Sequence, residues 1–162
     1  MFKLFLALAL ALPSTAAVAA ERLALFPFEF VDTSPEPPRP DELARLDALT
    51  EQARQRFVAA GFELVDLQPV EAALYQIAAL RDCNGCDLKL AREAGAGLSG
   101  VGWVQKVSNL ILNINLQIRD VATRKLLAAG SVDIRGNNDE SWRRGLKYLL
   151  DHRILPQPAP PP

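Results

Sequence analysis

The sequence predicts an α/β fold: a mixed five-stranded sheet packed with helices, in the order β-α-β-α-α-β-β-β-α. Residues 110–119 alternate between apolar side chains on one face and, apart from Ile111, polar side chains on the other, which is typical of a half-buried antiparallel strand. Residues 41–60 carry apolar side chains at helical spacing between two short strand-like segments. A helix between two strands makes a crossover connection, so we expect parallel pairing there and hairpins among the last three strands.

The first elements are set by an apolar run and a proline cluster. Residues 23–28 are predicted to form a largely buried strand, with Pro27 near its end because proline cannot donate to a strand ladder. The four prolines within residues 32–40 predict an exposed, extended loop. Asp41 is then a suitable N-cap for a helix that ends before Gly61.

The middle of the chain is expected to form a short strand, two short helical segments and the first strand of a meander. The strand covers residues 62–66, Pro69 opens one helix, and residues 87–94 form the other. Residues 98–107 are strand-like and rich in glycine. We interpret Gly100 and Gly102 as positions where a helix packs closely on the sheet.

The meander and a last helix complete the domain. Residues 110–119 and 126–134 are its second and third strands, joined by a turn at residues 120–124. Asn137 and Glu140 resemble a capping box. The apolar stripe of the helix that follows is made by Trp142, Leu146, Leu149, Leu150 and Ile154.

The first 20 residues are typical of a secretory signal peptide. Lys3 precedes the uncharged stretch 4–12, and small residues allow cleavage near residue 19 or 20. The stretch is shorter than the roughly 20 apolar residues that span a bilayer, and no later segment is longer. We therefore expect an exported, periplasmic chain with one domain over residues 21–155 and a disordered Pro-rich tail over 156–162.

Charge excludes some classes of partner. The formal net charge is −1, and removing the signal peptide removes one Lys and no acid, which gives −2. Nucleic-acid binding needs a basic footprint that this chain lacks. We also expect no cofactor, because no catalytic Ser/His/Asp set, nucleotide loop or metal site fits the pattern.

Cys83 and Cys86 are the only cysteines, in the segment Cys-Asn-Gly-Cys. One hypothesis is a redox dithiol at a helix N-terminus, where the helix dipole stabilises a thiolate. The other is a local structural disulfide, favoured by an oxidising compartment and by the flanking acids Asp82 and Asp87. Zinc would need about four ligands, and His152 is the one histidine available to join the two cysteines.

A GxGxxG match at residues 95–100 is a further weak signal. A predicted helix precedes these glycines and a predicted strand follows them, which is the reverse of the order in a phosphate-binding loop. Gly95 is therefore better interpreted as a helix C-cap. The polar face of the meander is the stronger candidate binding site, since a row of amides can bond a partner's backbone or a polar ligand. Its members are Asn113, Asn115, Gln117 and Arg119 on one strand, with Ser131, Asp133 and Arg135 on the next. The alternative is a sheet face that is solvated and binds nothing.

The stretch Val-Gly-Trp-Val-Gln-Lys-Val-Ser-Asn-Leu-Ile-Leu-Asn-Ile-Asn at 101–115, with the Cys-Asn-Gly-Cys segment, resembles an exported bacterial family filed as a domain of unknown function. The element order is also similar to the amino-terminal domain of periplasmic TolB and to related curli-secretion and lipoprotein-activator domains. That resemblance implies binding to other envelope proteins and no catalysis. In the family the turn after Thr123 takes Gly at its left-handed position, where this chain has Arg124.

Two functions therefore remain open from the sequence. The first is a non-catalytic periplasmic accessory protein that binds another envelope protein through the polar face. The second is a thiol–disulfide or electron-transfer accessory that uses Cys83 and Cys86. A third, weaker hypothesis places a small polar ligand on the same face.

Overall fold

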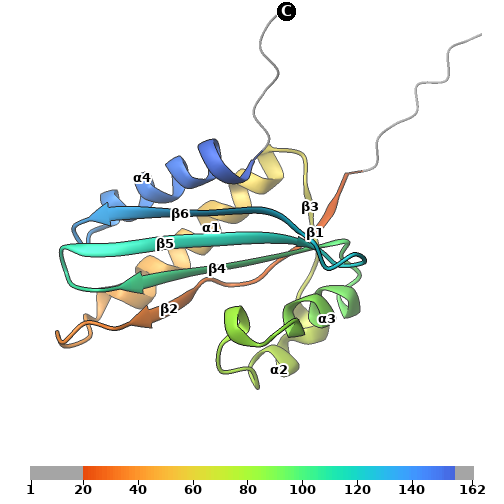
Figure 1. Cartoon of the computed structure of the whole chain (residues 1–162), viewed down its shortest axis with the longest axis horizontal. Coiled ribbons are helices and arrows are strands. Elements are labelled where there is room, and N and C mark those ends of the chain that lie inside the picture. The colour runs from red at the N-terminus through yellow and green to blue at the C-terminus, as the bar shows by residue number, and fades with distance from the viewer. Residues whose placement is uncertain (1–19, 156–162) are drawn as a thin grey trace, which may run out of the picture.

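A mixed sheet with helices on both faces makes up the computed structural model, which describes residues 20–155 (Figure 1). The predicted tail, and the predicted signal peptide apart from its last residue, lie outside this range. The strands are β1 (Arg22–Leu25), β2 (Glu29–Asp32), β3 (Glu63–Leu64), β4 (Leu98–Lys106), β5 (Ile111–Asp120) and β6 (Leu126–Arg135). The helices are α1 (Asp41–Ala59), α2 (Glu71–Leu74), α3 (Cys86–Glu93) and α4 (Asp139–Leu149), with short turns η1 (Gln68–Val70), η2 (Leu80–Asp82) and η3 (Leu150–Ile154).

The sheet has six strands, so the prediction of five was wrong. Its order is β3-β1-β4-β5-β6, and β2 pairs with β4 beyond the end of β1. The chain around Pro27 forms two strands in succession, both parallel to β4. Leu25 pairs with Gly100, and Glu29 pairs with Trp103. Leu25 and Glu29 are four residues apart, whereas their partners in β4 are three residues apart. The extra residue breaks the ladder at Pro27, which has no N–H to donate.

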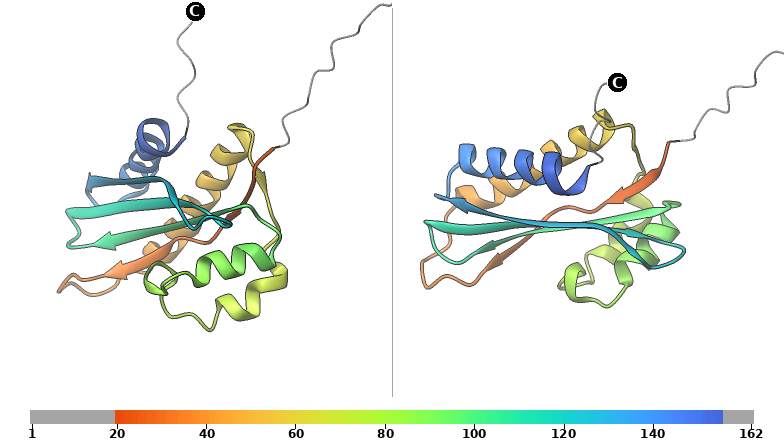
Figure 2. Two further views of the ribbon diagram at one scale, coloured as in Figure 1. Left: turned by 45° about the vertical axis from the view of Figure 1, so that its right-hand side comes forward. Right: turned by 45° about the horizontal axis from the view of Figure 1, so that its top comes forward.

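The three strands of the meander pair antiparallel, and their apolar residues face the core as predicted. β5 is antiparallel to both β4 and β6, and its apolar residues face α1 and α4. These two helices cover one face of the sheet along most of its length (Figure 2). The other face is covered at one end only, by α2, α3 and the turns beside them. The opposite half of that second face is left open.

The helix ends differ from prediction in two places. The N-cap of α1 is Pro40, not Asp41, and the carboxylate of Glu42 accepts the N–H of Arg39 instead. α4 is capped by Asn138, not Asn137: the Asn138 side chain accepts the N–H of Ser141 at 3.0 Å. Either asparagine suits a cap by type, and only the tertiary contacts of Asn137 decide between them.

Gly102 packs against an aromatic ring and not against a helix, contrary to our interpretation. A Cβ built at Gly102 would lie 2.4 Å from the ring of Phe28, which crosses the sheet between β1 and β2. A Cβ at Gly100 would likewise meet Leu25 and Ile118. By contrast, the left-handed conformation expected after α1 and α3 is confirmed at Gly61 and Gly95, with φ of 93° and 78°.

Candidate functional site

The open half of the sheet carries two cross-strand rows of mainly polar side chains. In the first, Trp103 of β4 pairs with Asn115 of β5, which pairs with Ser131 of β6. In the second, Gln105 pairs with Asn113, and Asn113 with Asp133. We call these six residues the polar face. Directly opposed residues lie about 5 Å apart, so the six side chains form one continuous surface.

Hydrogen bonds fix the orientation of the polar face. Asn113 Nδ2 donates to Asp133 Oδ1 at 2.7 Å, and Ser131 Oγ donates to Asn113 Oδ1 at 3.0 Å. Asn115 Nδ2 approaches the backbone oxygen of Asn113 at 3.5 Å. Ser131 and Asp133 are exposed, whereas Asn115 is buried. The amides are therefore held in place before any partner arrives, which lowers the entropy cost of binding.

Three of the predicted binding residues lie apart from this arrangement. Arg119 Nη1 donates to Asp87 Oδ1 at 3.1 Å, so Arg119 serves the contact between β5 and α3. Gln117 is half-buried and pairs with Val101, which belongs to the core under α3. Arg135 is exposed at the end of β6, opposite Ile111. Sequence periodicity put all three on one face, but α3 covers the end of that face where Gln117 and Arg119 lie.

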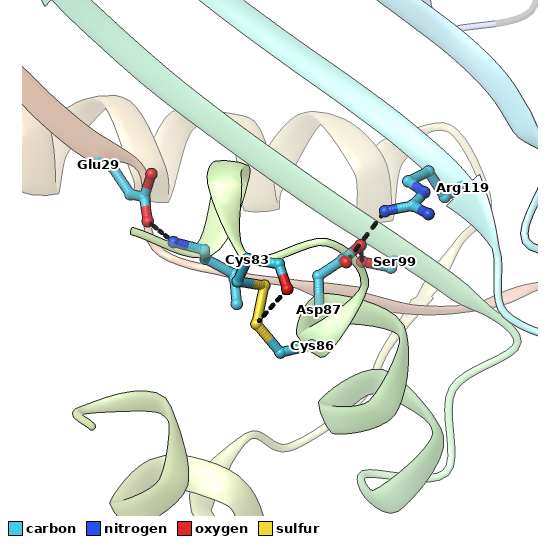
Figure 3. Close-up of a disulfide and its surroundings, with 7 residues drawn as sticks. Glu29, Cys83, Cys86, Asp87, Ser99 and Arg119 are labelled. Carbon is cyan, nitrogen blue, oxygen red and sulfur yellow. Dashed lines mark hydrogen bonds and ion pairs between the residues drawn. A yellow bond between two sulfur atoms is a disulfide. The ribbon is translucent and has the colours of Figure 1, made fainter. Parts of the chain in front are cut away.

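The Cys-Asn-Gly-Cys segment forms a disulfide between Cys83 and Cys86 at the corner between η2 and α3 (Figure 3). Gly85 and Asn84 both have positive φ, 107° and 51°, which the tight corner requires. Both cysteines are half-buried against the smaller apolar core. Cys86 is the first residue of α3, and Cys83 follows a 3-10 turn instead of a strand.

Charged groups anchor this corner to the sheet on both sides of the disulfide. Glu29 of β2 accepts the backbone N–H of Leu80 and a bond from Arg81 Nη1 at 2.8 Å. On the other side, the buried carboxylate of Asp87 accepts bonds from Ser99 Oγ at 2.8 Å and from Arg119 (Figure 3). The acids beside the cysteines therefore have structural partners.

Arg124 has a left-handed conformation, with φ of 62°, at the position where the resembling family usually has Gly. Its guanidinium lies over the disulfide corner: a Cβ built at Gly85 would be 2.9 Å from Arg124 Nη2. The turn between β5 and β6 thus reaches the Cys-Asn-Gly-Cys segment, although about 40 residues of sequence separate them.

A buried ionic cluster at the other end of the sheet was missed by sequence reasoning. Lys106 is fully buried, and its Nζ lies 2.8 Å from Glu42 Oε1 and 3.4 Å from Asp32 Oδ2. Asn137 Nδ2 donates to Glu42 Oε1 at 2.6 Å. The sequence contained a clue to this cluster. Lys106 lies two residues after the core-facing Val104 in the same strand, so its side chain points to the same buried face.

Asn137 is the centre of this cluster. Its Oδ1 accepts bonds from Arg45 Nη1 at 2.8 Å and from the indole N–H of Trp142 at 3.1 Å. Arg45 also bonds Asp139 at 2.8 Å and Asp41 at 2.6 Å, and stands over the Trp142 ring. Among the described residues, no buried side-chain nitrogen or oxygen lacks a partner. The cluster joins the starts of α1 and α4 to the ends of β4 and β6.

The ionisation of the pair follows from these contacts. Burial by itself would raise the pKa of Glu42, but hydrogen bonds from Lys106, the Arg39 backbone and Asn137 bring that pKa below its usual value. Burial would lower the pKa of Lys106, but its bonds to Glu42 and Asp32 raise that pKa above its usual value. Both groups are therefore charged at neutral pH.

Other places that could hold a ligand offer less chemistry. A groove of about 640 Å³ runs between α1 and α4, with Ala44, Ala48 and Leu49 among its lining residues. His152 is exposed and packs its ring 4.4 Å from that of Tyr148. Over residues 20–155, no three His, Cys, Asp or Glu side chains come together in a way that could hold a metal ion. No helix in the same range is long and apolar enough to cross a membrane.

Comparison with known proteins identifies a family and a fold. The profile of the family DUF3280, described as "Protein of unknown function (DUF2380)", matches residues 21–154. No curated protein sequence matches the chain.

Several solved structures share the fold. The LpoB C-terminal domain from Salmonella enterica is 19% identical, with a TM-score of 0.51 over 75% of this chain and 87% of that one. The PelC dodecamer from Paraburkholderia phytofirmans is 11% identical, with a TM-score of 0.52 over 83% and 88%. Hypothetical protein CT253 from Chlamydia trachomatis is 12% identical, with a TM-score of 0.50 over 82% and 94%. At such identities the likeness concerns the fold.

Proposed function

We propose that this chain, which belongs to the DUF3280 family, is a periplasmic accessory protein that binds another protein of the cell envelope and catalyses no reaction itself. Export rests on the signal-peptide pattern of residues 1–20. Envelope binding agrees with the resemblance of the element order to the TolB amino-terminal domain and its relatives, which remains a prediction from sequence.

The observation that carries the proposal is the open, pre-ordered polar face. Half of one sheet face has no helix over it, and Asn113, Ser131 and Asp133 on this half are bonded to one another. Trp103, half-buried in the middle strand, supplies the kind of aromatic anchor that dominates protein interfaces. The amides and the carboxylate around it supply the polar contacts that orient a partner.

The test uses a photo-cross-linking residue placed on the polar face. Installed at Gln105 and activated in the periplasm of the native host, it should give one cross-linked adduct of defined mass. The same residue at Gln55, exposed on α1, is the matched control and should give no such adduct. Asp133→Lys reverses a charge in the same cross-strand row as the probe and should abolish the adduct while the melting temperature stays within a few degrees. Equal adducts from both positions, or none from Gln105, would refute the proposed binding face.

The second candidate is a thiol–disulfide or electron-transfer accessory. The position of Cys86 at the first residue of α3 favours it, because helix N-terminal N–H groups stabilise a thiolate. The anchoring of the same corner by Glu29, Asp87 and Arg124 favours a structural disulfide. The reduction potential separates the two, as set out in the Discussion.

A further inference from the structure

β6 is the outermost strand on one side of the sheet and pairs, in the described residues, with β5 alone (Figure 1). At the other edges β3 has two residues and β2 has four, whereas β6 has ten. A short edge strand offers few unpaired groups to another chain, but a strand of ten residues offers many. β6 is therefore the one long edge among the described strands.

The backbone groups that face outward from β6 follow from the ladder. Gly136 donates its N–H to the Leu110 oxygen at 3.0 Å, so Gly136 faces β5. In an antiparallel ladder the direction alternates at each residue. Ala129, Ser131, Asp133 and Arg135 therefore present their N–H and C=O groups at the free edge. The pairing of β5 with β6 has a register shift beside Ile118 and Arg119. The residues of β6 from Ala129 to Arg135 lie beyond that shift and pair regularly.

β6 has few of the features that protect an exposed edge. Such edges are usually guarded by charged side chains, above all Lys, by Pro or by a bulge within the exposed stretch. Residues 126–135 contain no Lys and no Pro, and their two charged residues, Asp133 and Arg135, have opposite signs. They also include Leu126 and Leu127, which are more than half exposed. A weakly guarded edge of this length is a template for pairing with another strand.

α4 adds an exposed aromatic pair on the same side of the molecule. Arg143 and Asp151 lie on the side facing α1, since the backbone oxygen of Arg143 accepts a bond from Gln52 and Asp151 bonds Arg56. Gly145 and Leu149 face the sheet, over Ile134 and Gly130. At 100° per residue, Tyr148 then lies on the flank away from α1, beside the free edge. His152 of η3 packs its ring against that of Tyr148. Tyr148 is 50% exposed.

We propose that two copies of this chain pair through antiparallel β6 strands, with Ser131 at the two-fold axis, so that the sheets join into one continuous sheet. This register uses the whole free edge. It places Ser131 opposite Ser131 of the partner subunit and Asp133 opposite Ala129 of the partner subunit, so no like charges face each other. A two-fold interface needs such a self-complementary surface.

The same register brings the α4 flanks together. Because Leu149 lies over Gly130, next to Ser131 in the strand, the neighbouring Tyr148 lies near the two-fold axis. Tyr148 and Tyr148 of the partner subunit can then contact across the axis, and aromatic residues are enriched at interfaces. Strand pairing and aromatic packing therefore support one arrangement, and both flank the polar face without covering it.

Sedimentation equilibrium tests the proposal by measuring the mass of the mature chain, residues 21–162, at protein concentrations from about 1 µM to about 1 mM. We expect the mass of a dimer at the upper end of this range. Ser131→Pro removes one outward N–H, and Tyr148→Lys places like charges near the axis, so each should shift the dimer–monomer midpoint at least tenfold upward. Tyr75→Lys, which changes an exposed tyrosine on α2, is the matched control and should leave the midpoint unchanged.

A cysteine at the two-fold axis tests the proposed register of the β6 strands directly. Ser131→Cys should form a disulfide between two copies under mild oxidation, whereas Gln117→Cys, on the interior strand β5, should not. A wild-type chain that stays monomeric up to 1 mM would overturn the proposal and leave the edge to an extended segment of another protein. A dimer that neither Ser131→Pro nor Tyr148→Lys weakens would also overturn it. Far-ultraviolet circular dichroism identifies a variant that fails to fold, in which case the other variant decides.

Discussion

Lys106 Nζ lies 2.8 Å from Glu42 Oε1, and solvent reaches neither side chain appreciably, at 0% and 2% exposure. A lysine at the end of a central strand thus meets a glutamate in the first turn of α1, 64 residues earlier in the chain. Desolvating two such charges costs several kcal/mol, and the cost is repaid only when the pair is close and its remaining hydrogen bonds are satisfied. Here Asp32, Asn137 and the Arg39 backbone complete those bonds.

Lys106→Met should therefore destabilise the protein by about 3–5 kcal/mol, because it leaves Glu42 buried and unpaired. Urea unfolding measures the loss. The double variant Lys106→Met with Glu42→Gln should recover part of it, since no buried charge remains. Lys89→Met is the control: Lys89 and Glu93 form an exposed pair, so its loss should stay within about 1 kcal/mol. A loss at Lys106 no larger than at Lys89 would contradict the role of the pair.

The Lys106–Glu42 pair should make the protein less stable at both low and high pH. The folded pKa of Glu42 is below its usual value of 4.5, so its contribution is present above about pH 4.5 and is lost as the pH falls through the folded pKa. The folded pKa of Lys106 is above 10.5, so its contribution is present below about pH 10.5 and is lost as the pH rises further. Melting temperatures across pH 3–11 measure both. The difference between wild type and the double variant should be constant between these limits.

Asn137 and Asn138 should respond differently to alanine. Asn138→Ala removes the cap of α4 and should cost about 1 kcal/mol. Asn137→Ala leaves Arg45 Nη1 and Trp142 Nε1 without their acceptor, at about 1–3 kcal/mol each, and removes one of the bonds to Glu42, so it should cost at least about 2 kcal/mol. Chemical unfolding of the two variants compares them. The reverse order of losses would show that Asn137 is not the centre of the cluster.

Gly102→Ala should be severely destabilising, by about 1–3 kcal/mol or more, because the new methyl group meets the Phe28 ring at 2.4 Å. Gly97→Ala is its control, since the nearest atom to a Cβ at Gly97 is the Arg22 oxygen at 3.9 Å, an ordinary contact. Thermal unfolding distinguishes the two. Equal melting temperatures would mean that Phe28 moves aside at little cost.

The disulfide should have a small effect on the stability of the protein and should resist reduction. Removing it by Cys83→Ala with Cys86→Ala should cost about 2 kcal/mol, the chain-entropy value for so short a loop. Equilibration with redox buffers should give a reduction potential below about −300 mV, typical of structural disulfides. A potential near those of the oxidoreductases, well above −300 mV, would instead favour the thiol–disulfide function and remove the case for a structural disulfide.

Local pattern determined much of this protein from the sequence. The period of two identified the strands of the meander and their core-facing side, because a one-residue slip would expose every apolar side chain of β5 to water. The helical stripes identified α1 and α4, and glycines at the helix ends identified the left-handed positions at Gly61 and Gly95.

Only the tertiary structure decided which of these residues share a site. It split the first strand at Pro27, turned Arg119 toward Asp87, and took Asn137 out of a helix cap into the buried cluster around Lys106 and Glu42. The reason is physical. Periodicity states which side of a strand a residue occupies, but the coverage of that side depends on how α3 and the starts of α1 and α4 pack. Those contacts join residues 30 to 95 positions apart, and the local pattern of one strand or helix carries no signal of them.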